Sequence, residues 1–92
     1  MIFEWDEAKR LSNLEQHGLE FLDVDALLDG AHVQGKATTV AGEERWWAMG
    51  RIDDVLAAVI FTRRGDAIQV ISLRRARHEE RRRYQTLHLG RA

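Results

Sequence analysis

The chain has 92 residues and no cysteine, a length that allows one small domain and a composition that excludes disulfides and thiolate metal sites. A hydrophobic content of 45% and three tryptophans are typical of a folded chain, and the net charge at pH 7 is −1. The sequence contains neither a long apolar run nor a secretory signal, so we expect a cytoplasmic protein that does not enter a membrane.

The N-terminal residues predict a short strand followed by a helix. Residues 2–5 alternate in polarity, which is typical of an edge strand. Asp6 is placed to cap a helix from Glu7 to His17, and Gly18 follows at the position where glycine commonly ends helices. One side of this helix carries Ala8, Leu11 and Leu14. The other side carries Lys9, Asn13, Gln16 and His17, and is either solvated or a site where Lys9 and His17 converge.

Residues 19–29 predict a second short helix, and the middle of the chain predicts a sheet. The helix has an apolar stripe of Phe21, Val24, Leu27 and Leu28, with Asp23, Asp25 and Asp29 facing away. Strands are expected at residues 33–40, 45–52, 55–63 and 67–73. Their short connections favour an antiparallel meander with the apolar strand 55–61 at its centre. Trp46 and Trp47 then project to opposite faces of the sheet.

An arginine-rich helix is expected from Ala76 onward. Its inner stripe consists of Ala76, Glu80, Tyr84 and Leu87. Six arginines lie between residues 74 and 83, and they cannot all be buried. This order of elements predicts an α+β fold in one domain spanning residues 1–92, with two N-terminal helices, an antiparallel meander of about four strands and a C-terminal helix.

The charges are segregated along the chain. Residues 1–44 hold three basic and ten acidic side chains, whereas residues 45–92 hold eleven basic and five acidic ones. All eleven basic residues of the second half are arginines, whose planar guanidinium suits phosphate oxygens, although arginines in surface salt bridges would give the same composition. A basic face that attracts a polyanion is therefore compatible with a net charge near zero.

Most enzyme classes have no motif in this sequence. It contains no phosphate-binding P-loop, dinucleotide-binding glycine turn or HExxH metal motif, and its four histidines are scattered, so we expect no metal and no cofactor. Arginines can still bind a phosphate and stabilise a pentavalent phosphorane when the substrate supplies its own nucleophile. RNA does so, because its 2′-OH can attack the adjacent phosphorus.

Three separated motifs resemble the BrnT toxins, the RelE-like ribonuclease components of bacterial type II toxin–antitoxin systems. They are FEWDEAKRLSNLEQHG at residues 3–18, the pair Gly50-Arg51, and VISLRRARHEERRRY at residues 70–84. The resemblance implies a RelE-like α+β fold and metal-independent RNA cleavage that inhibits translation. It also implies a hetero-oligomer with a ribbon-helix-helix antitoxin of the BrnA type, which neutralises the toxin and through which alone the complex contacts promoter DNA.

The resemblance and the distribution of basic residues together indicate site residues. The expected catalytic set is Arg51, Lys36, Arg74, Arg75, His17 and Tyr84. The expected RNA-binding set is Lys9, Arg63, Arg77, Arg81 and Arg82. Gly50 would let a substrate backbone approach closely, and Glu80 is expected to pair with an arginine rather than act as a base. The general base stays open between His17, Lys9, Glu44 and Tyr84.

The sequence departs from the family pattern at two helix ends. The second helix ends in Leu28-Asp29-Gly30 instead of an acidic residue and proline. Arg77 replaces a capping threonine before the last helix, and the lost cap would weaken that helix by about 1 kcal/mol. Two other functions remain as alternatives: a non-catalytic basic module that binds nucleic acid or an acidic protein, and an independent DNA-binding regulator.

Overall fold

The computed structural model describes residues 2–89, which form an α+β arrangement of three α-helices, one 3-10 turn and a five-stranded sheet. The elements are β1 (Ile2–Glu4), α1 (Glu7–His17), η1 (Phe21–Asp23), α2 (Val24–Asp29), β2 (His32–Lys36), β3 (Trp46–Ile52), β4 (Val55–Arg64), β5 (Ala67–Arg75) and α3 (His78–Leu89). The predicted α+β class is therefore confirmed. Residues 1 and 90–92 of the expected domain lie outside the described residues.

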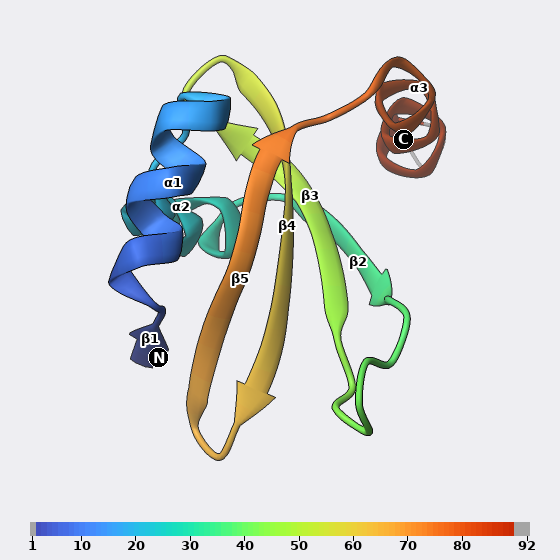
Figure 1. Ribbon diagram of the computed structural model, residues 1–92. Helices are drawn as coiled ribbons and strands as arrows, with labels where there is room; N and C mark the ends of the chain where they lie inside the picture. The colour runs from blue at the N-terminus through green and yellow to red at the C-terminus, as the bar shows by residue number, and fades with distance from the viewer. Residues whose placement is uncertain (1, 90–92) are drawn as a thin grey trace.

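The sheet is mixed, with the strand order β1-β5-β4-β3-β2 (Figure 1). Strands β2 to β5 pair antiparallel with their neighbours in sequence. Strand β1 instead pairs parallel to β5, with Ile2 opposite Ala67. The expectation of about four antiparallel strands was thus incomplete, because three alternating residues carry no signal for strand direction.

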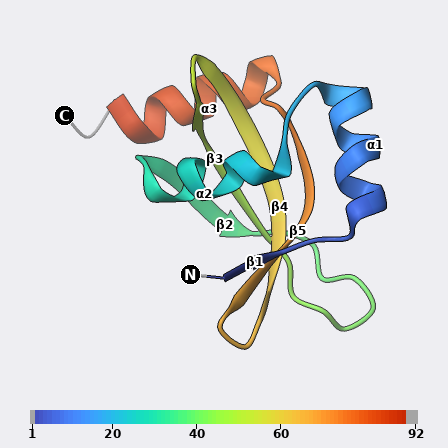
Figure 2. The same ribbon diagram turned by 90° about the vertical axis from the view of Figure 1, so that its left-hand side faces the viewer.

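The helices cover the two faces of the sheet unequally. Helices α1 and α2 lie on one face (Figure 2), where α1 packs on β5 and α2 packs on β3. The main core lies beneath them and includes fully buried Val24, Leu27 and Val59. On the other face α3 covers one end of the sheet, and Met49, Ala58 and Tyr84 form a smaller cluster. The central position predicted for residues 55–61 is confirmed, since β4 is the third of five strands.

The ends of α1 were predicted correctly, but its buried side was not. Asp6 accepts a hydrogen bond of 3.0 Å from the Ala8 N–H, and Gly18 ends the helix with φ +69°. Leu11 and Leu14, however, are 53% and 37% exposed, whereas Asn13 is 7% exposed. The Asn13 side chain accepts a bond from the Leu73 N–H at 3.1 Å and donates to the Leu19 carbonyl at 3.3 Å. Buried backbone groups require hydrogen-bond partners, and the Asn13 amide supplies both a donor and an acceptor, which a leucine side chain lacks.

The helix predicted at residues 19–29 is divided into η1 and α2, so its α-helical part begins only at Val24. Three other boundaries differ from the prediction by two residues or more. Strand β2 ends at Lys36 instead of residue 40, and the following loop contains an isolated bridge between Val40 and Glu43. Strand β5 continues to Arg75, two residues beyond its predicted end, because Arg74 and Arg75 pair with Ala58 and Ala57 of β4. Helix α3 consequently begins at His78 rather than at residue 76.

Candidate active site

A cavity of about 220 Å³ lies at the end of the sheet that α3 covers. We call it the arginine cavity. Its lining residues are Arg51, Asp54, Val55, Leu56, Arg75, Ala76, Arg81, Tyr84 and Gln85. They come from β3, the β3–β4 turn, β4, the end of β5 and α3. Four of the predicted site residues therefore meet in one cavity: Arg51, Arg75, Arg81 and Tyr84.

The register of the sheet explains why two distant arginines meet there. Arg51 of β3 lies opposite Leu56 of β4. The Leu56 carbonyl in turn accepts a hydrogen bond of 2.9 Å from the N–H of Ala76, directly after Arg75. Arg51 and the end of β5 are thus level with each other and two strands apart, or about 10 Å. Arg51 and Arg75 both line the arginine cavity.

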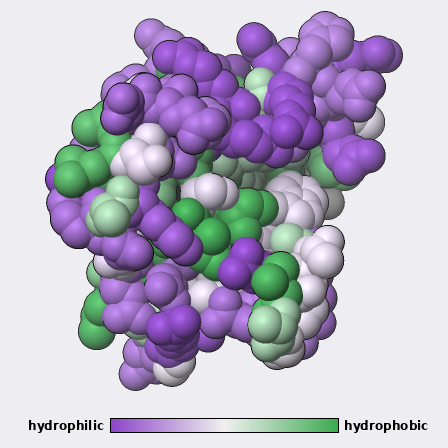
Figure 3. Space-filling model, viewed as in Figure 1, coloured by the Kyte–Doolittle hydropathy of each residue, from purple (hydrophilic) through white to green (hydrophobic). Residues whose placement is uncertain are grey.

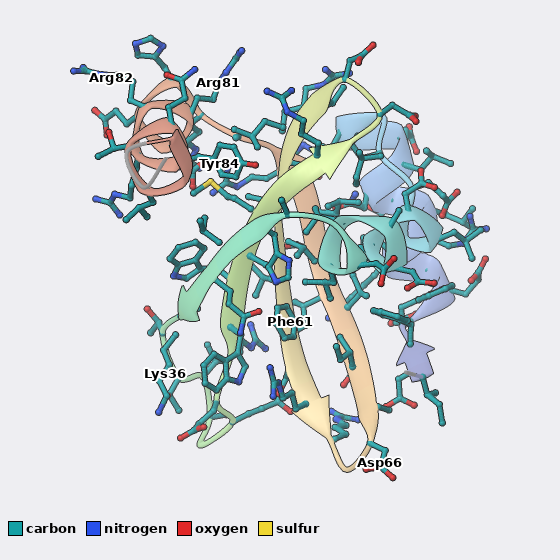
Figure 4. All side chains as sticks on the ribbon, turned by 180° about the vertical axis from the view of Figure 1, so that it is seen from behind. Lys36, Phe61, Asp66, Arg81, Arg82 and Tyr84 are labelled. Carbon is teal, nitrogen blue, oxygen red and sulfur yellow. The ribbon has the colours of Figure 1, made fainter. Side chains whose placement is uncertain are left out.

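Helix α3 lines the arginine cavity on the side opposite the strands. Tyr84 points toward the sheet and is 6% exposed, and it packs with Met49 and Ala58 (Figure 4). Arg81 lies on the same helix, is exposed and lines the cavity beside it. Tyr84 therefore anchors the helix to the sheet, and Arg81 is the third arginine that lines the cavity.

The start of α3 is held by Glu80. Its carboxylate accepts a hydrogen bond of 2.7 Å from the Arg77 N–H, which is one half of a capping box. The same carboxylate pairs with Arg74, and this pairing lowers the pKa of Glu80 to about 2 and raises the pKa of Arg74. The predicted pairing of Glu80 with an arginine is confirmed. The capping threonine is absent, yet the backbone at Arg77 still has a side-chain partner.

Gly50 does not serve as an opening for substrate, contrary to the expectation. It is buried, and a Cβ at this position would lie 3.2 Å from Cγ of Leu27 in α2 and 3.1 Å from Cβ of His32. Its face of β3 is the one that α2 covers, whereas Arg51 projects to the other face. Glycine at this position allows close packing of α2 on the sheet.

Two predicted residues lie together at the other end of the sheet. Lys36 is paired with Trp46 across β2 and β3, five residues along β3 from Arg51, which corresponds to about 17 Å. Its Nζ lies 5.5 Å from the centre of the Trp46 ring, and the Arg63 guanidinium lies 5.3 Å from the same centre. Lys36 also faces Glu44 at 3.8 Å. Figure 4 shows Lys36 far from Arg81 and Tyr84.

The remaining predicted residues lie outside the described lining of the arginine cavity. Lys9 lines a separate open hollow between α1 and β5, and His17 lies in the last turn of α1. Arg77 and Arg82 are exposed, and Arg82 points away from the sheet in Figure 4. Arg74 lines a neighbouring groove, where it is paired with Glu80.

Sequence reasoning missed several residues around the cavity. Asp54 and Gln85 line it, and Trp47 and Met49 line the neighbouring groove. The signal for the last two was present, because strand alternation places residues 47, 49 and 51 on one face of β3. Among the described residues no group of three or more His, Cys, Asp or Glu is placed to hold a metal ion, and no helix is long and apolar enough to cross a membrane.

Comparison with known proteins supports the assignment that these residues suggest. A search of curated proteins gives no match. The family model described as the ribonuclease toxin BrnT of type II toxin–antitoxin systems matches residues 5–80, which is most of the chain and includes Arg51, Arg74 and Arg75. The chain therefore belongs to the BrnT family of ribonuclease toxins of type II toxin–antitoxin systems.

Proposed function

We propose that the arginine cavity is the centre at which this toxin cleaves RNA without a metal ion. The observation that supports the proposal is the convergence of Arg51, Arg75 and Arg81 on one cavity that carries a single lining carboxylate, Asp54. Three guanidiniums can bind the phosphate and offset the charge that develops on its oxygens in the transition state. They would also orient the ribose so that its 2′-oxygen is in line with the bond to be broken.

In the proposed reaction the 2′-oxygen forms a bond to phosphorus while the bond from phosphorus to the 5′-oxygen breaks. The 2′-OH loses its proton, and the departing 5′-oxygen gains one. Two lining groups are suited to these transfers: the Asp54 carboxylate as acceptor and the Tyr84 phenol as donor. The products are a 2′,3′-cyclic phosphate and a 5′-OH end, and the cut RNA no longer supports translation.

Partners follow from the same proposal. A toxin of this kind acts on cytoplasmic RNA. Its antitoxin must cover the positively charged residues so that RNA cannot bind to them. We propose a ribbon-helix-helix antitoxin that covers the arginine-rich end of the sheet and supplies the contacts to promoter DNA. Hydrogen exchange in residues 74–83 should then be slower in the complex than in the free toxin.

The test is cleavage of a labelled RNA by the purified protein in EDTA. Wild type should release fragments ending in 2′,3′-cyclic phosphate, and Arg51→Ala should lower the cleavage rate by about 100-fold or more. The matched control is Arg64→Ala, because Arg64 is an exposed arginine near the β4–β5 turn that pairs with Glu43 at 3.4 Å. Salt-sensitive RNA binding by a folded wild type without any cleavage would favour the non-catalytic module instead.

A further inference from the structure

A second cavity of about 220 Å³ lies next to the arginine cavity, on the face of the sheet that α3 partly covers. We call it the Trp47 groove. Its lining residues are Trp47, Met49, Ala58, Ile60, Arg74, Glu80 and Arg83. The strands supply an apolar floor, and Arg83 and the Arg74–Glu80 pair form a charged rim. Hydrophobic surface is visible in a hollow at the centre of Figure 3, beneath a hydrophilic upper edge.

The indole of Trp47 is held in position by the neighbouring edge strand. Trp47 lies opposite Gly35 of β2, and a Cβ at Gly35 would come within 2.9 Å of the ring atom Cζ2. The ring therefore lies directly against the β2 backbone, where only glycine leaves room. Trp47 is half-buried, so the part of the ring that lines the groove forms a fixed aromatic wall.

The groove and the arginine cavity lie side by side along β3. Trp47, Met49 and Arg51 project from one face of β3 at intervals of two residues, about 7 Å each. Helix α3 lines both cavities, with Arg83 over the groove and Arg81 over the arginine cavity. Met49 and Tyr84 pack together in the cluster between them. A chain with a phosphate beside Arg51 would thus extend along β3 over the groove.

An apolar floor, an aromatic wall and guanidiniums at the rim match the chemistry of an unpaired nucleobase. Bases stack on aromatic side chains and on arginine, and such stacking contributes strongly to binding of single strands. The groove has a volume of about 220 Å³. Its rim carries two arginines and one glutamate, which leaves one positive charge in excess beside an anionic backbone.

We propose that the Trp47 groove receives an unpaired base adjacent to the cleaved linkage, which makes single-stranded RNA the substrate class of this toxin. The proposal rests on the function proposed above and adds a base-binding subsite to it. A base inside a duplex is stacked between its neighbours and cannot enter the groove. Cleavage therefore requires a strand that is free to turn one base out of its stack.

The experiment uses a short RNA with one cleavage position, in which each neighbouring nucleotide is replaced in turn by an abasic one. For wild type, the abasic substitution at one position should lower kcat/KM roughly ten-fold, as expected for the loss of one base–aromatic stack. Trp47→Ala should lower kcat/KM on the intact RNA by a similar factor and show no further loss on the abasic RNA. Trp47→Phe should keep most of the activity, Arg64→Ala should behave as wild type, and the same RNA in a duplex should resist cleavage.

Two results with Trp47→Ala would decide against the subsite. A folded Trp47→Ala protein that cleaves the intact RNA as fast as wild type overturns it, as does an abasic penalty that persists in this variant. Loss of antitoxin binding without loss of RNA cleavage in Trp47→Ala would make the groove a protein-binding surface. If wild type cleaves no RNA, the proposed function fails by itself. Equal binding of a single-stranded oligonucleotide by wild type and Trp47→Ala would then overturn the subsite separately.

Discussion

Arg74 and Glu80 join the end of β5 to the first turn of α3 through two parallel hydrogen bonds, of 2.6 Å from Nη1 to Oε1 and 2.8 Å from Nη2 to Oε2. This bidentate geometry fixes both side chains, and each is 29% exposed. The adjacent Arg75 makes no such pair in the described structure and lines the arginine cavity. The two neighbouring arginines therefore differ in their contacts: Arg74 is paired with Glu80, and Arg75 lines the arginine cavity.

The Arg74–Glu80 pair predicts how stability depends on pH. The pKa of Glu80 is lowered to about 2 in the folded protein, while an unfolded glutamate titrates near 4.3. The stabilisation is therefore fully present above about pH 5 and is lost as the pH falls toward 2. At pH 7 we expect Glu80→Gln to lower the free energy of unfolding by about 1 kcal/mol, a value limited by the partial exposure of the pair.

Urea unfolding of wild type and Glu80→Gln at a series of pH values checks this prediction. The difference between the two proteins should shrink steadily between about pH 5 and pH 2. A difference that stays constant over this range would show that the Glu80 charge does not contribute. Glu79→Gln is the matched control, because Glu79 is exposed in the same helical turn.

Asn13 predicts a larger effect on stability. Its side chain is the hydrogen-bond partner of the Leu73 N–H and the Leu19 carbonyl, both buried. Asn13→Ala would leave these two backbone groups unpaired, so we expect the free energy of unfolding to fall by about 2–3 kcal/mol. Gln16 lies on the same helix and is exposed, so Gln16→Ala should change the free energy of unfolding by less than about 0.5 kcal/mol. Equal effects of the two substitutions in urea unfolding would contradict this account.

The β3–β4 turn predicts that stability depends on the shape of the side chain at residue 53. Asp53 has φ +53°, a left-handed conformation that aspartate and asparagine tolerate better than β-branched residues. Asp53→Val should lower the free energy of unfolding by about 1–2 kcal/mol, and Asp53→Asn should leave it nearly unchanged. Thermal unfolding measures both, with Asp54→Val as the control because Asp54 has no positive φ. A loss as large for Asp54→Val as for Asp53→Val would refute the conformational explanation.

The separation of Lys36 from the arginine cavity predicts unequal effects on cleavage. Arg75→Ala removes a lining guanidinium and should reduce the RNA cleavage rate by about 100-fold. Lys36→Ala removes a cation that lies beside Trp46 and Glu44 at the far end of the sheet, and the rate should change by less than about two-fold. Single-turnover cleavage of one RNA by both variants measures the contrast. A large loss for Lys36→Ala would require a second catalytic region near Trp46.

Local signals in the sequence predicted the elements better than their packing. The Asp6 cap and the Gly18 stop gave the ends of α1, because capping depends on adjacent residues alone. The leucines of α1 predicted the wrong buried side for this helix. The side that is buried carries Asn13, whose partner is the N–H of Leu73, 60 residues further along the chain. The paired arginines predicted a site at the end of β5, but only the register of three strands shows that Arg51 is level with it.

The parallel pairing of β1 with β5 has a consequence for synthesis. Residues 2–4 are made before their partners, residues 67–69, so β1 has no strand to pair with until β5 has been made. The Asn13 side chain of α1 likewise meets its partner, the Leu73 N–H, only after β5 has been made, and α3 is the last of the described elements. The arginine cavity, which residues from β3 to α3 line, can therefore form only after Arg81, Tyr84 and Gln85 have been made.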